Sequence, residues 1–335
     1  MLNIQNIEYY LPENIITNDE LALSNPEWDM NSIQRWTGVS KRFYANPNQT
    51  ALDLAFISSE KLLNDIETVR GEIDGLIFCT QSNDHIIPPN STILHGMLNL
   101  SEDVFSFDFN LACSGFIYGL SIANGLIETN VARNILLVNA DTYSKYVNDK
   151  DRSTKVLFGD AASTSFLKKS DDGKGLIDII CGTSGINSDK IIIPAGGARK
   201  PKSNKTSILK EDQNGNLRND ENLQMNGFAV YSFVNSKVPK QIIKILFKNK
   251  IKIGEIDLFV FHQANKLVLE SLTKILKIDP EKVFINIHKV SNTVSASIPI
   301  ALKEAQKEGK IRDGYKVLCS GFGAGLSWGT CILQF

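Results

Sequence analysis

Two stretches of this chain resemble each other closely enough to constrain the fold. Residues 71–82 read GEIDGLIFCTQS, and residues 254–265 read GEIDLFVFHQAN. Each apolar strand is followed by a predicted helix and then by a further strand that begins Val-Phe, at Val104 and at Val283. Repeated strand–helix units indicate stacked α/β layers, and 335 residues are many for one core. The sequence therefore predicts an α/β protein of two similar halves.

The boundary between the halves is expected in the polar, glycine-rich segment KKSDDGKG at 168–175. This gives an N-terminal half at residues 1–170 and a C-terminal half at residues 174–335. Hydrophobic periodicity and turn residues then predict the individual elements. The expected strands are 3–10, 73–79, 134–139, 163–167, 176–181, 256–261, 283–287, 317–320 and 327–333. The expected helices are one opened by a capping box at 17–20, 26–42 with a turn at Gly38, 50–63, 91–98, 226–247, 266–276 and 297–308.

Residues 106–120, SFDFNLACSGFIYGL, change from strand-like alternation to small residues and then to helical spacing. The predicted geometry is strand, sharp turn and helix, with Cys113 at or just before the first helical turn. Free backbone N–H groups and the helix dipole favour a thiolate there, so Cys113 can be a nucleophile. The alternative interpretation, a small buried hydrophobe, stays open for this stretch alone.

Two polar residues of the second half occupy matching positions. The two Val-Phe strands lie 179 residues apart, and the same shift moves Cys113 to Asn292, in VSNTVSAS. His262 follows the apolar run 258–261, at the strand end where open α/β sheets bind ligands. Asn292 is also a candidate helix cap, and His262 a candidate buried polar group. If the halves pack face to face, these residues and Cys113 converge on one site.

The glycine-rich run 321–325, GFGAG, can bring backbone N–H groups close to a ligand. It lacks the Lys-Ser/Thr of a P-loop and a full GxGxxG, which argues against a phosphate loop. A cysteine at a helix start, a histidine, an asparagine and backbone donors together describe thioester chemistry. The thiolate attacks an acyl thioester, N–H groups hold the oxyanion, and the imidazole and carboxamide stabilise an enolate.

Composition excludes several other classes of protein. The formal net charge of -1 argues against a general nucleic-acid binder and gives no sign of membrane-surface binding. No apolar run reaches the length of a membrane span, and the N-terminus lacks the features of a signal peptide. The cysteines, at 79, 113, 181, 319 and 331, lack CxxC spacing, so neither a disulfide framework nor a zinc site is expected. A reducing cytoplasm is the expected location.

Four motifs together resemble a known family. ACSG at Cys113, HQAN at His262, SNTVSASIP around Asn292 and GFGAGLSWG from Gly321 look like beta-ketoacyl-[acyl-carrier-protein] synthase III, one of the thiolase-fold condensing enzymes. LPENIITNDEL, WTGVSKR and FGDAAS, which begins at Phe158, are also similar to that family. The resemblance covers nearly the whole chain in order. It implies the thiolase fold, a five-layer α-β-α-β-α arrangement of two similar halves, and a homodimer.

The resemblance also implies roles for individual residues. Cys113 would accept an acyl group from acyl-CoA, a substrate, with no metal or organic cofactor. His262 and Asn292 would stabilise the enolate formed when malonyl-[acyl-carrier protein] loses CO2, and the enolate would attack the acyl-cysteine. The oxyanion hole would be the backbone N–H groups of Cys113 and Ala324. The implied substrate-binding positions are Arg152, Ile87, Trp36, Asn265 and Lys266.

The chain departs from the family pattern at several of these positions. Ser291 replaces the glycine that usually precedes the catalytic asparagine. Leu267, beside Lys266, replaces a phosphate-contacting arginine, and Ile87 stands where an aromatic gate to the acyl pocket is common. Trp36, like Trp28, is displaced from the family's CoA-stacking tryptophan. These departures indicate a specialised relative rather than the housekeeping initiator of fatty-acid synthesis.

Alternative functions stay open at this level. A related acyltransferase of specialised or surface-glycan metabolism would move the acyl group without decarboxylation. A Cys-His thioester hydrolase would release free acid, and an inactive partner subunit would do neither. The polar segment 196–222 is a solvated excursion or an active-site lid, of which the excursion is favoured. Lys266, Lys274 and Lys277 form a solvated helix face or a docking face for an acidic carrier protein.

Overall fold

The two largest β-sheets of the described chain, one in each half, have similar strand arrangements. A computed structural model describes residues 1–65, 70–170 and 173–335. The first sheet has the order β1 (Leu2–Tyr10), β7 (Ala161–Lys169), β6 (Asn134–Asp141), β4 (Gly75–Cys79) and β5 (Phe105–Phe109). The second has the order β8 (Gly175–Thr183), β15 (Ser327–Gln334), β14 (Lys316–Gly323) and β13 (Leu258–Phe261). In both sheets the first two pairings are antiparallel, and the third pairing, of β6 with β4 or of β14 with β13, is parallel.

The predicted strand at 283–287 is wrong. The place that β5 holds in the first sheet is taken in the second by one parallel bridge, Phe259 to Val283. The Gln263 side chain accepts a hydrogen bond from the Asn286 backbone N–H and donates one to the Phe284 carbonyl. A side-chain amide thus satisfies backbone groups that a neighbouring strand would otherwise pair, and the chain turns into α9 (Ile287–Val290).

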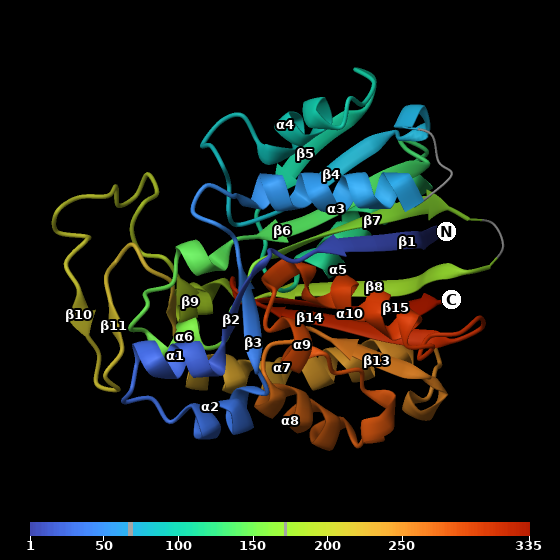
Figure 1. The fold of residues 1–335 in the computed structure, drawn as a ribbon. Helices are drawn as coiled ribbons and strands as arrows, with labels where there is room; N and C mark the ends of the chain where they lie inside the picture. Colours follow the sequence, from blue (N-terminus) through green and yellow to red (C-terminus); the bar gives the residue numbers. More distant parts are fainter. Residues whose placement is uncertain (66–69, 171–172) are drawn as a thin grey trace.

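Helices separate and cover the two sheets, giving five layers (Figure 1). The first outer layer is α3 (Ala51–Asp65) and α4 (Asn90–Met97), the middle layer is α5 (Gly115–Glu128) and α10 (Ser297–Lys307), and the other outer layer is α7 (Gly227–Lys248) and α8 (Lys266–Leu276). Three large apolar clusters fill the spaces between these layers. The predicted five-layer arrangement of two similar halves is therefore confirmed.

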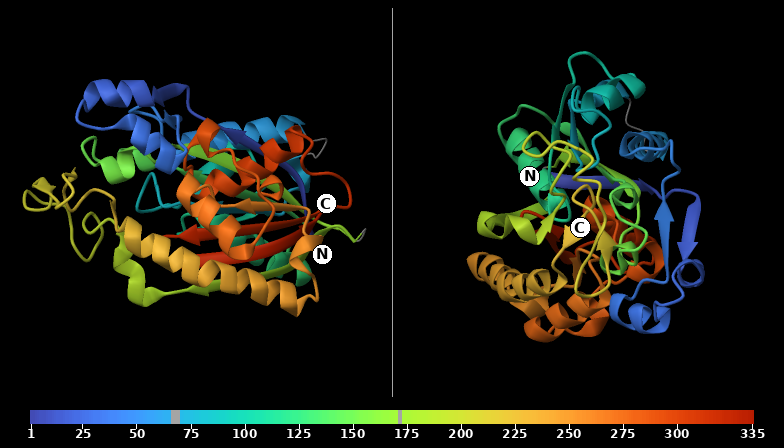
Figure 2. Two further views of the ribbon diagram at one scale, coloured as in Figure 1. Left: turned by 90° about the horizontal axis from the view of Figure 1, so that it is seen from below. Right: turned by 90° about the vertical axis from the view of Figure 1, so that its left-hand side faces the viewer.

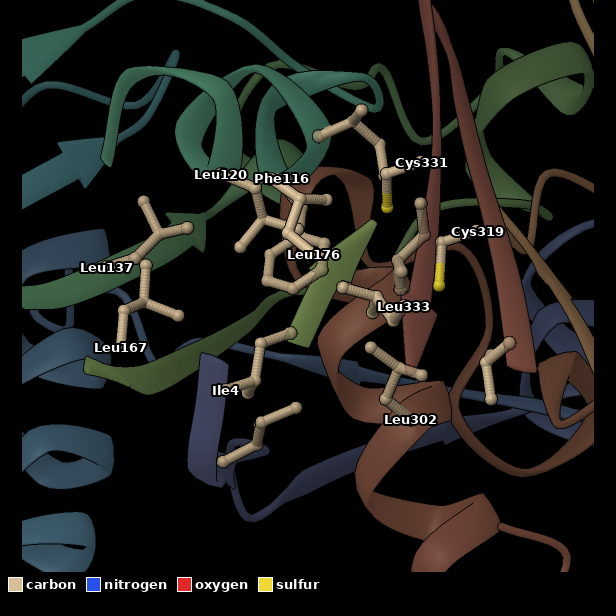
Figure 3. Close-up of a cluster of buried hydrophobic side chains, with 14 of the residues drawn as sticks. Ile4, Phe116, Leu120, Leu137, Leu167, Leu176, Leu302, Cys319, Cys331 and Leu333 are labelled. Carbon is tan, nitrogen blue, oxygen red and sulfur yellow. The ribbon is translucent and has the colours of Figure 1, made fainter. Parts of the chain in front are cut away.

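Apolar side chains pack the two helices of the middle layer against both sheets (Figure 3). Phe116 and Leu120 of α5 and Leu302 of α10 are buried between the sheets, against Leu137 of the first sheet and Leu333 of the second. Each fully buried side chain of this size stabilises the fold by about 1.5–3 kcal/mol. The turns that precede α5 and α10, which carry Cys113 and Asn292, are held by this packing.

The N-terminal segment covers one end of the layers. The predicted capping box is confirmed: Thr17 and Glu20 cap α1 (Asn18–Ser24) reciprocally. The helix predicted at 26–42 is shorter, because α2 (Met30–Thr37) ends at Gly38, whose φ of 74° is left-handed. The chain then continues as β3 (Lys41–Tyr44), which pairs with β2 (Asn14–Thr17).

The polar segment 196–222 projects from the body of the molecule (Figures 1 and 2). It holds one short hairpin, β10 (Lys210–Glu211) and β11 (Leu217–Arg218), and most of its residues are exposed. Arg218 ties the hairpin to Asp151, which precedes the short helix α6 (Arg152–Lys155). A further small ladder, β9 (Ile191–Ile192) with β12 (Gln224–Met225), closes the base of the segment. The segment 196–222 therefore fits the predicted solvated excursion better than an active-site lid.

Two features bear on the predicted boundary and on membrane insertion. Residues 171–172 of the predicted boundary segment lie outside the described residues. In the described part of the chain, no helix is at once long and apolar enough to cross a membrane.

Candidate active site

Cys113, His262 and Asn292 line one cavity of about 410 Å³ at the junction of the two halves. The rest of its wall is mostly apolar and includes Leu157, Met225 and Val268. Phe228, which is 83% exposed, and Leu267 also line it, so the cavity opens to solvent between the starts of α7 and α8. A sulfur atom from the first half therefore faces the same space as an imidazole and a carboxamide from the second.

Cys113 occupies the tight turn between β5 and α5, two residues before the helix begins. The Gly115 N–H donates to the Ala112 carbonyl at 2.7 Å, which closes the turn. The hairpin of β14 and β15 packs directly on the thiol, because a Cβ at Gly323 would lie 2.8 Å from the Cys113 Cβ and 2.9 Å from its Sγ. Only glycine fits this close approach. The predicted sequence of strand, turn and helix is confirmed.

The expectation that the helix start favours a thiolate is wrong for the unliganded site. Burial raises the pKa of Cys113 above its ordinary value, and the nearby Asp141 carboxylate raises it further. Burial of the sulfur in a mostly apolar cavity removes the solvation that a thiolate needs. Both effects favour the thiol form of Cys113.

His262 follows β13, and its backbone N–H donates to the Ser320 carbonyl at 2.9 Å. Its ring Nδ1 lies 2.6 Å from the Ser297 hydroxyl oxygen, and its ring edge meets Phe322 at a centroid distance of 5.5 Å. Burial lowers the pKa of His262 to about 3, so the imidazole is neutral at physiological pH. When Ser297 donates to Nδ1, the one ring proton lies on Nε2, which can then donate a hydrogen bond.

The Asn292 carboxamide is oriented by the backbone around it. Its Oδ1 accepts a hydrogen bond from the Val294 N–H at 3.0 Å, while Nδ2 donates a long bond of 3.4 Å to the Ala264 carbonyl. The Asn292 N–H donates to the Leu157 carbonyl, and its own carbonyl accepts from the Gly159 N–H, both at 3.0 Å. These bonds form a parallel bridge to the first half and leave an amide N–H of Asn292 available to a ligand.

Ser291, the residue before Asn292, has a strained backbone conformation. It is buried, with φ 62° and ψ −166°, a conformation that glycine adopts almost alone. Its hydroxyl donates to the Val290 carbonyl at 2.5 Å. Such a conformation costs about 1–3 kcal/mol and persists only where the surrounding structure enforces it.

The remaining sequence-predicted residues lie in different places. Asn265 lines the cavity and caps α8, and Ala324 lines a neighbouring cavity of about 360 Å³. Lys266 lines a separate surface groove of about 680 Å³ and pairs with Glu270 at 3.6 Å. Trp36 and Ile87 are exposed, by 59% and 83%, and do not line the catalytic cavity. Arg152 is also exposed and donates to the Asn214 carbonyl, in the projecting segment.

Sequence reasoning missed residues that act on the site through contacts. Ser297 lies inside the SNTVSASIP motif, but nothing in the motif indicates its hydrogen bond to His262. Asp141, at the end of β6, accepts hydrogen bonds from the Ser295 hydroxyl at 2.5 Å and from the Gln81 N–H at 2.8 Å. Among the residues that the structure describes, no group of three histidine, cysteine or acidic side chains could hold a metal ion.

Comparison with known families gives two matches along the chain. Residues 107–185 match the model for 3-oxoacyl-[acyl-carrier-protein (ACP)] synthase III. Residues 246–335 match the model for the C-terminal part of the same synthase. The two matched segments contain Cys113 in one case and His262 and Asn292 in the other.

Individual relatives cover nearly the whole chain. The beta-ketoacyl-[acyl-carrier-protein] synthase III of Fusobacterium nucleatum is 33% identical, over 100% of this chain and 98% of its own length. The same synthase of Caldanaerobacter subterraneus is 35% identical, over 97% of this chain and 95% of its own length. A crystal structure of a 3-oxoacyl-(acyl-carrier-protein) synthase III is 37% identical, with a TM-score of 0.98. The match covers 100% of this chain and 99% of that one. The crystal structure of the 3-oxoacyl-(acyl-carrier protein) synthase from Burkholderia xenovorans LB400 is 30% identical, with a TM-score of 0.91. The match covers 99% of this chain and 93% of that one.

Proposed function

The chain belongs to the 3-oxoacyl-[acyl-carrier-protein] synthase III family, and we propose that it condenses an acyl-CoA with malonyl-[acyl-carrier protein], releasing CO2. The observation that carries the proposal is the shared cavity of Cys113, His262 and Asn292. A thiol and two neutral hydrogen-bond donors suit an acyl-cysteine intermediate followed by an enolate.

The first half-reaction transfers the acyl group to Cys113. The sulfur attacks the thioester carbonyl of acyl-CoA, and the Cys113 proton leaves with the departing CoA thiol. The oxyanion is proposed to rest between the backbone N–H groups of Cys113 and Ala324. The close packing of Gly323 on the thiol supports this, since it brings the β14–β15 turn to the reacting carbon.

The second half-reaction uses the same cavity after CoA has left. The malonyl thioester loses CO2, and negative charge develops on its thioester oxygen. His262 Nε2–H and Asn292 Nδ2–H are proposed to donate hydrogen bonds to that oxygen. The enolate carbon then attacks the acyl carbonyl, and Cys113 leaves as the thiolate, which takes up a proton from solvent to regenerate the thiol. Burial lowers the pKa of His262 to about 3, so the neutral ring can donate from Nε2 while Nδ1 accepts from the Ser297 hydroxyl.

The geometry disfavours the hydrolase alternative. A Cys-His hydrolase needs a base to activate water, usually a histidine oriented by a carboxylate. His262 instead has the hydroxyl of Ser297 at Nδ1, and its pKa is too low for an effective base near neutral pH.

Further proposals concern assembly and substrate contacts. β5 has one strand partner among the described residues, and its half-buried Phe105, Phe107 and Phe109 leave an open edge that supports a homodimer. We propose acyl carrier protein as a partner, a cytoplasmic location, and two thiolase-like halves at 1–170 and 174–335. The proposed substrate contacts outside the reacting atoms remain Arg152, Ile87, Trp36, Asn265 and Lys266.

One assay tests the proposal. Radiolabelled acyl-CoA is supplied first, then malonyl-[acyl-carrier protein], and label and CO2 are followed. Label on Cys113 followed by a β-ketoacyl product and CO2 is the expected result. Free acid alone would indicate a hydrolase, and a labelled product without CO2 would indicate plain acyl transfer. No label, with Cys113→Ala indistinguishable from the unchanged chain, would indicate an inactive subunit.

A further inference from the structure

A second cavity, which we call the polar chamber, adjoins the catalytic cavity and has a volume of about 360 Å³. Its polar wall consists of Gln81, Asn110, Tyr143, Tyr146 and Ser188. The rest of the chamber wall is mainly aliphatic, with Ile191, Ile192, Ile193 and Leu223, whereas polar side chains form a smaller part of the wall of the catalytic cavity. The two spaces therefore suit different parts of a substrate.

The polar chamber lies beside the reacting sulfur. Ile191 lines both cavities, and Ala324, on the chamber wall, directly follows the glycine that packs on Cys113. The Tyr143 ring packs on the Phe158 ring at a centroid distance of 5.3 Å, and Phe158 lines the catalytic cavity. Cys113 and Tyr143 belong to one buried cluster, and the partly buried Ala324 packs against it. A thioester carbonyl at Cys113 would thus have the polar chamber on one side and the catalytic cavity on the other.

Three polar side chains of the chamber, those of Tyr143, Gln81 and Asn110, form a hydrogen-bonded chain. The Tyr143 hydroxyl donates to Gln81 Oε1 at 2.5 Å, and Gln81 Nε2 donates to Asn110 Oδ1 at 2.8 Å. Tyr143 is almost fully buried, and burial raises the pKa of its phenol, so it stays neutral. No lysine or arginine is among the described residues that line the chamber. The wall therefore offers neutral donors and acceptors and no counter-charge for an anion.

On the basis of the proposed condensation, we propose that this chamber holds the acyl chain of the donor and selects a neutral hydroxyacyl group. An unsubstituted acyl chain would remove water from the half-buried Gln81 and from the spare lone pairs of the buried Tyr143 hydroxyl without replacing its hydrogen bonds. A hydroxyl group within a few carbons of the thioester replaces them. Sites built around buried polar groups reject the analogue that lacks the partner more strongly than apolar pockets reject an extra hydroxyl.

The test compares donors that differ by one hydroxyl group. The rate of Cys113 acylation is measured by intact-protein mass spectrometry with butyryl-CoA, 3-hydroxybutyryl-CoA and 4-hydroxybutyryl-CoA. At least one hydroxylated donor should react about 10-fold faster than butyryl-CoA. Two hydroxylated donors that react no faster than butyryl-CoA would overturn the proposal. Failure of every donor to label Cys113 would instead count against the proposed condensation itself.

Variants then locate the selection. Tyr143→Phe and Gln81→Met should each reduce the ratio of hydroxyacyl to acyl rates towards one. Tyr118→Phe is the matched control, because the Tyr118 hydroxyl bonds the Gly182 carbonyl and does not line the chamber. A ratio that survives in both chamber variants would overturn the assignment, and the second variant keeps the test valid if the first does not fold.

Discussion

The Nδ1 atom of His262 lies 2.6 Å from the hydroxyl oxygen of Ser297, and both side chains are buried. The partner at Nδ1 decides which ring nitrogen of a neutral histidine carries its proton. A hydroxyl that donates to Nδ1 directs the Nε2–H into the cavity. Ser297 is thereby a positioning residue for the proposed enolate donor.

Ser297→Ala should slow the malonyl half-reaction by about 10-fold or more, because the imidazole loses the bond that sets its tautomer. Acylation of Cys113 should change by less than about 3-fold, since the proposed oxyanion hole of that step uses backbone N–H groups. Single-turnover measurements of the two half-reactions separate the effects. Ser297→Thr, which keeps a hydroxyl, should restore the malonyl step. An equal loss in both steps would mean that Ser297 only supports the fold.

Alkylation of Cys113 by iodoacetamide should still be increasing at about pH 9, by about 10-fold per pH unit. Its pKa is raised, so the thiolate is a minor species through the neutral range and its fraction rises with pH. Mass spectrometry of the peptide that contains Cys113 gives the rate separately from that of the exposed Cys181. A plateau below about pH 7 would indicate a thiolate and contradict this account.

Ser291→Gly should be more stable than Ser291→Ala by about 1–2 kcal/mol. Both substitutions remove the hydroxyl bond to the Val290 carbonyl, but only glycine relieves the left-handed backbone. Urea unfolding of the pair measures the difference. Equal midpoints would show that the backbone at this position is not strained.

Asp141→Asn should destabilise the protein less at pH 8 than at pH 5. Burial raises the pKa of Asp141 from 3.8 to about 7, so the folded state holds a proton that the unfolded state has lost between these values. The group's contribution is therefore complete below about pH 4 and is lost as the pH rises through about 7. The difference between the two pH values should be about 1–3 kcal/mol.

Urea midpoints of Asp141→Asn and of the unchanged chain, taken at both pH values, measure this dependence. Asp149→Asn is the matched control, because the Asp149 side chain is 83% exposed. A penalty for Asp141→Asn that grows with pH would reverse the sign and show that Asp141 is ionised in the folded protein.

Most of the fold could be predicted from the sequence because its elements carry local signals. The helix predicted at 266–276 coincides with α8, and the strand, turn and helix around Cys113 follow from small residues between two periodic runs. The error at 283–287 has a non-local cause. Gln263, about 20 residues earlier in the chain, supplies the hydrogen bonds that a strand partner would supply.

The site was predictable only in part for a similar reason. Motifs and the repeat identify Cys113, His262 and Asn292, which the structure brings to one cavity. The protonation of Cys113 depends on burial and on Asp141, neither of which a helix-start pattern reports. The bond between Tyr143 and Gln81 spans 62 residues, so no local pattern links them.

The backbone bridge between Phe158 and Asn292 has a mechanical consequence. It fastens the carboxamide of the second half to the frame that also carries Cys113. The two hydrogen bonds of Asn292, to Leu157 and from Gly159, thus couple the position of the carboxamide to the first half, whereas the exposed Phe228 at the entrance takes no part in this bridge.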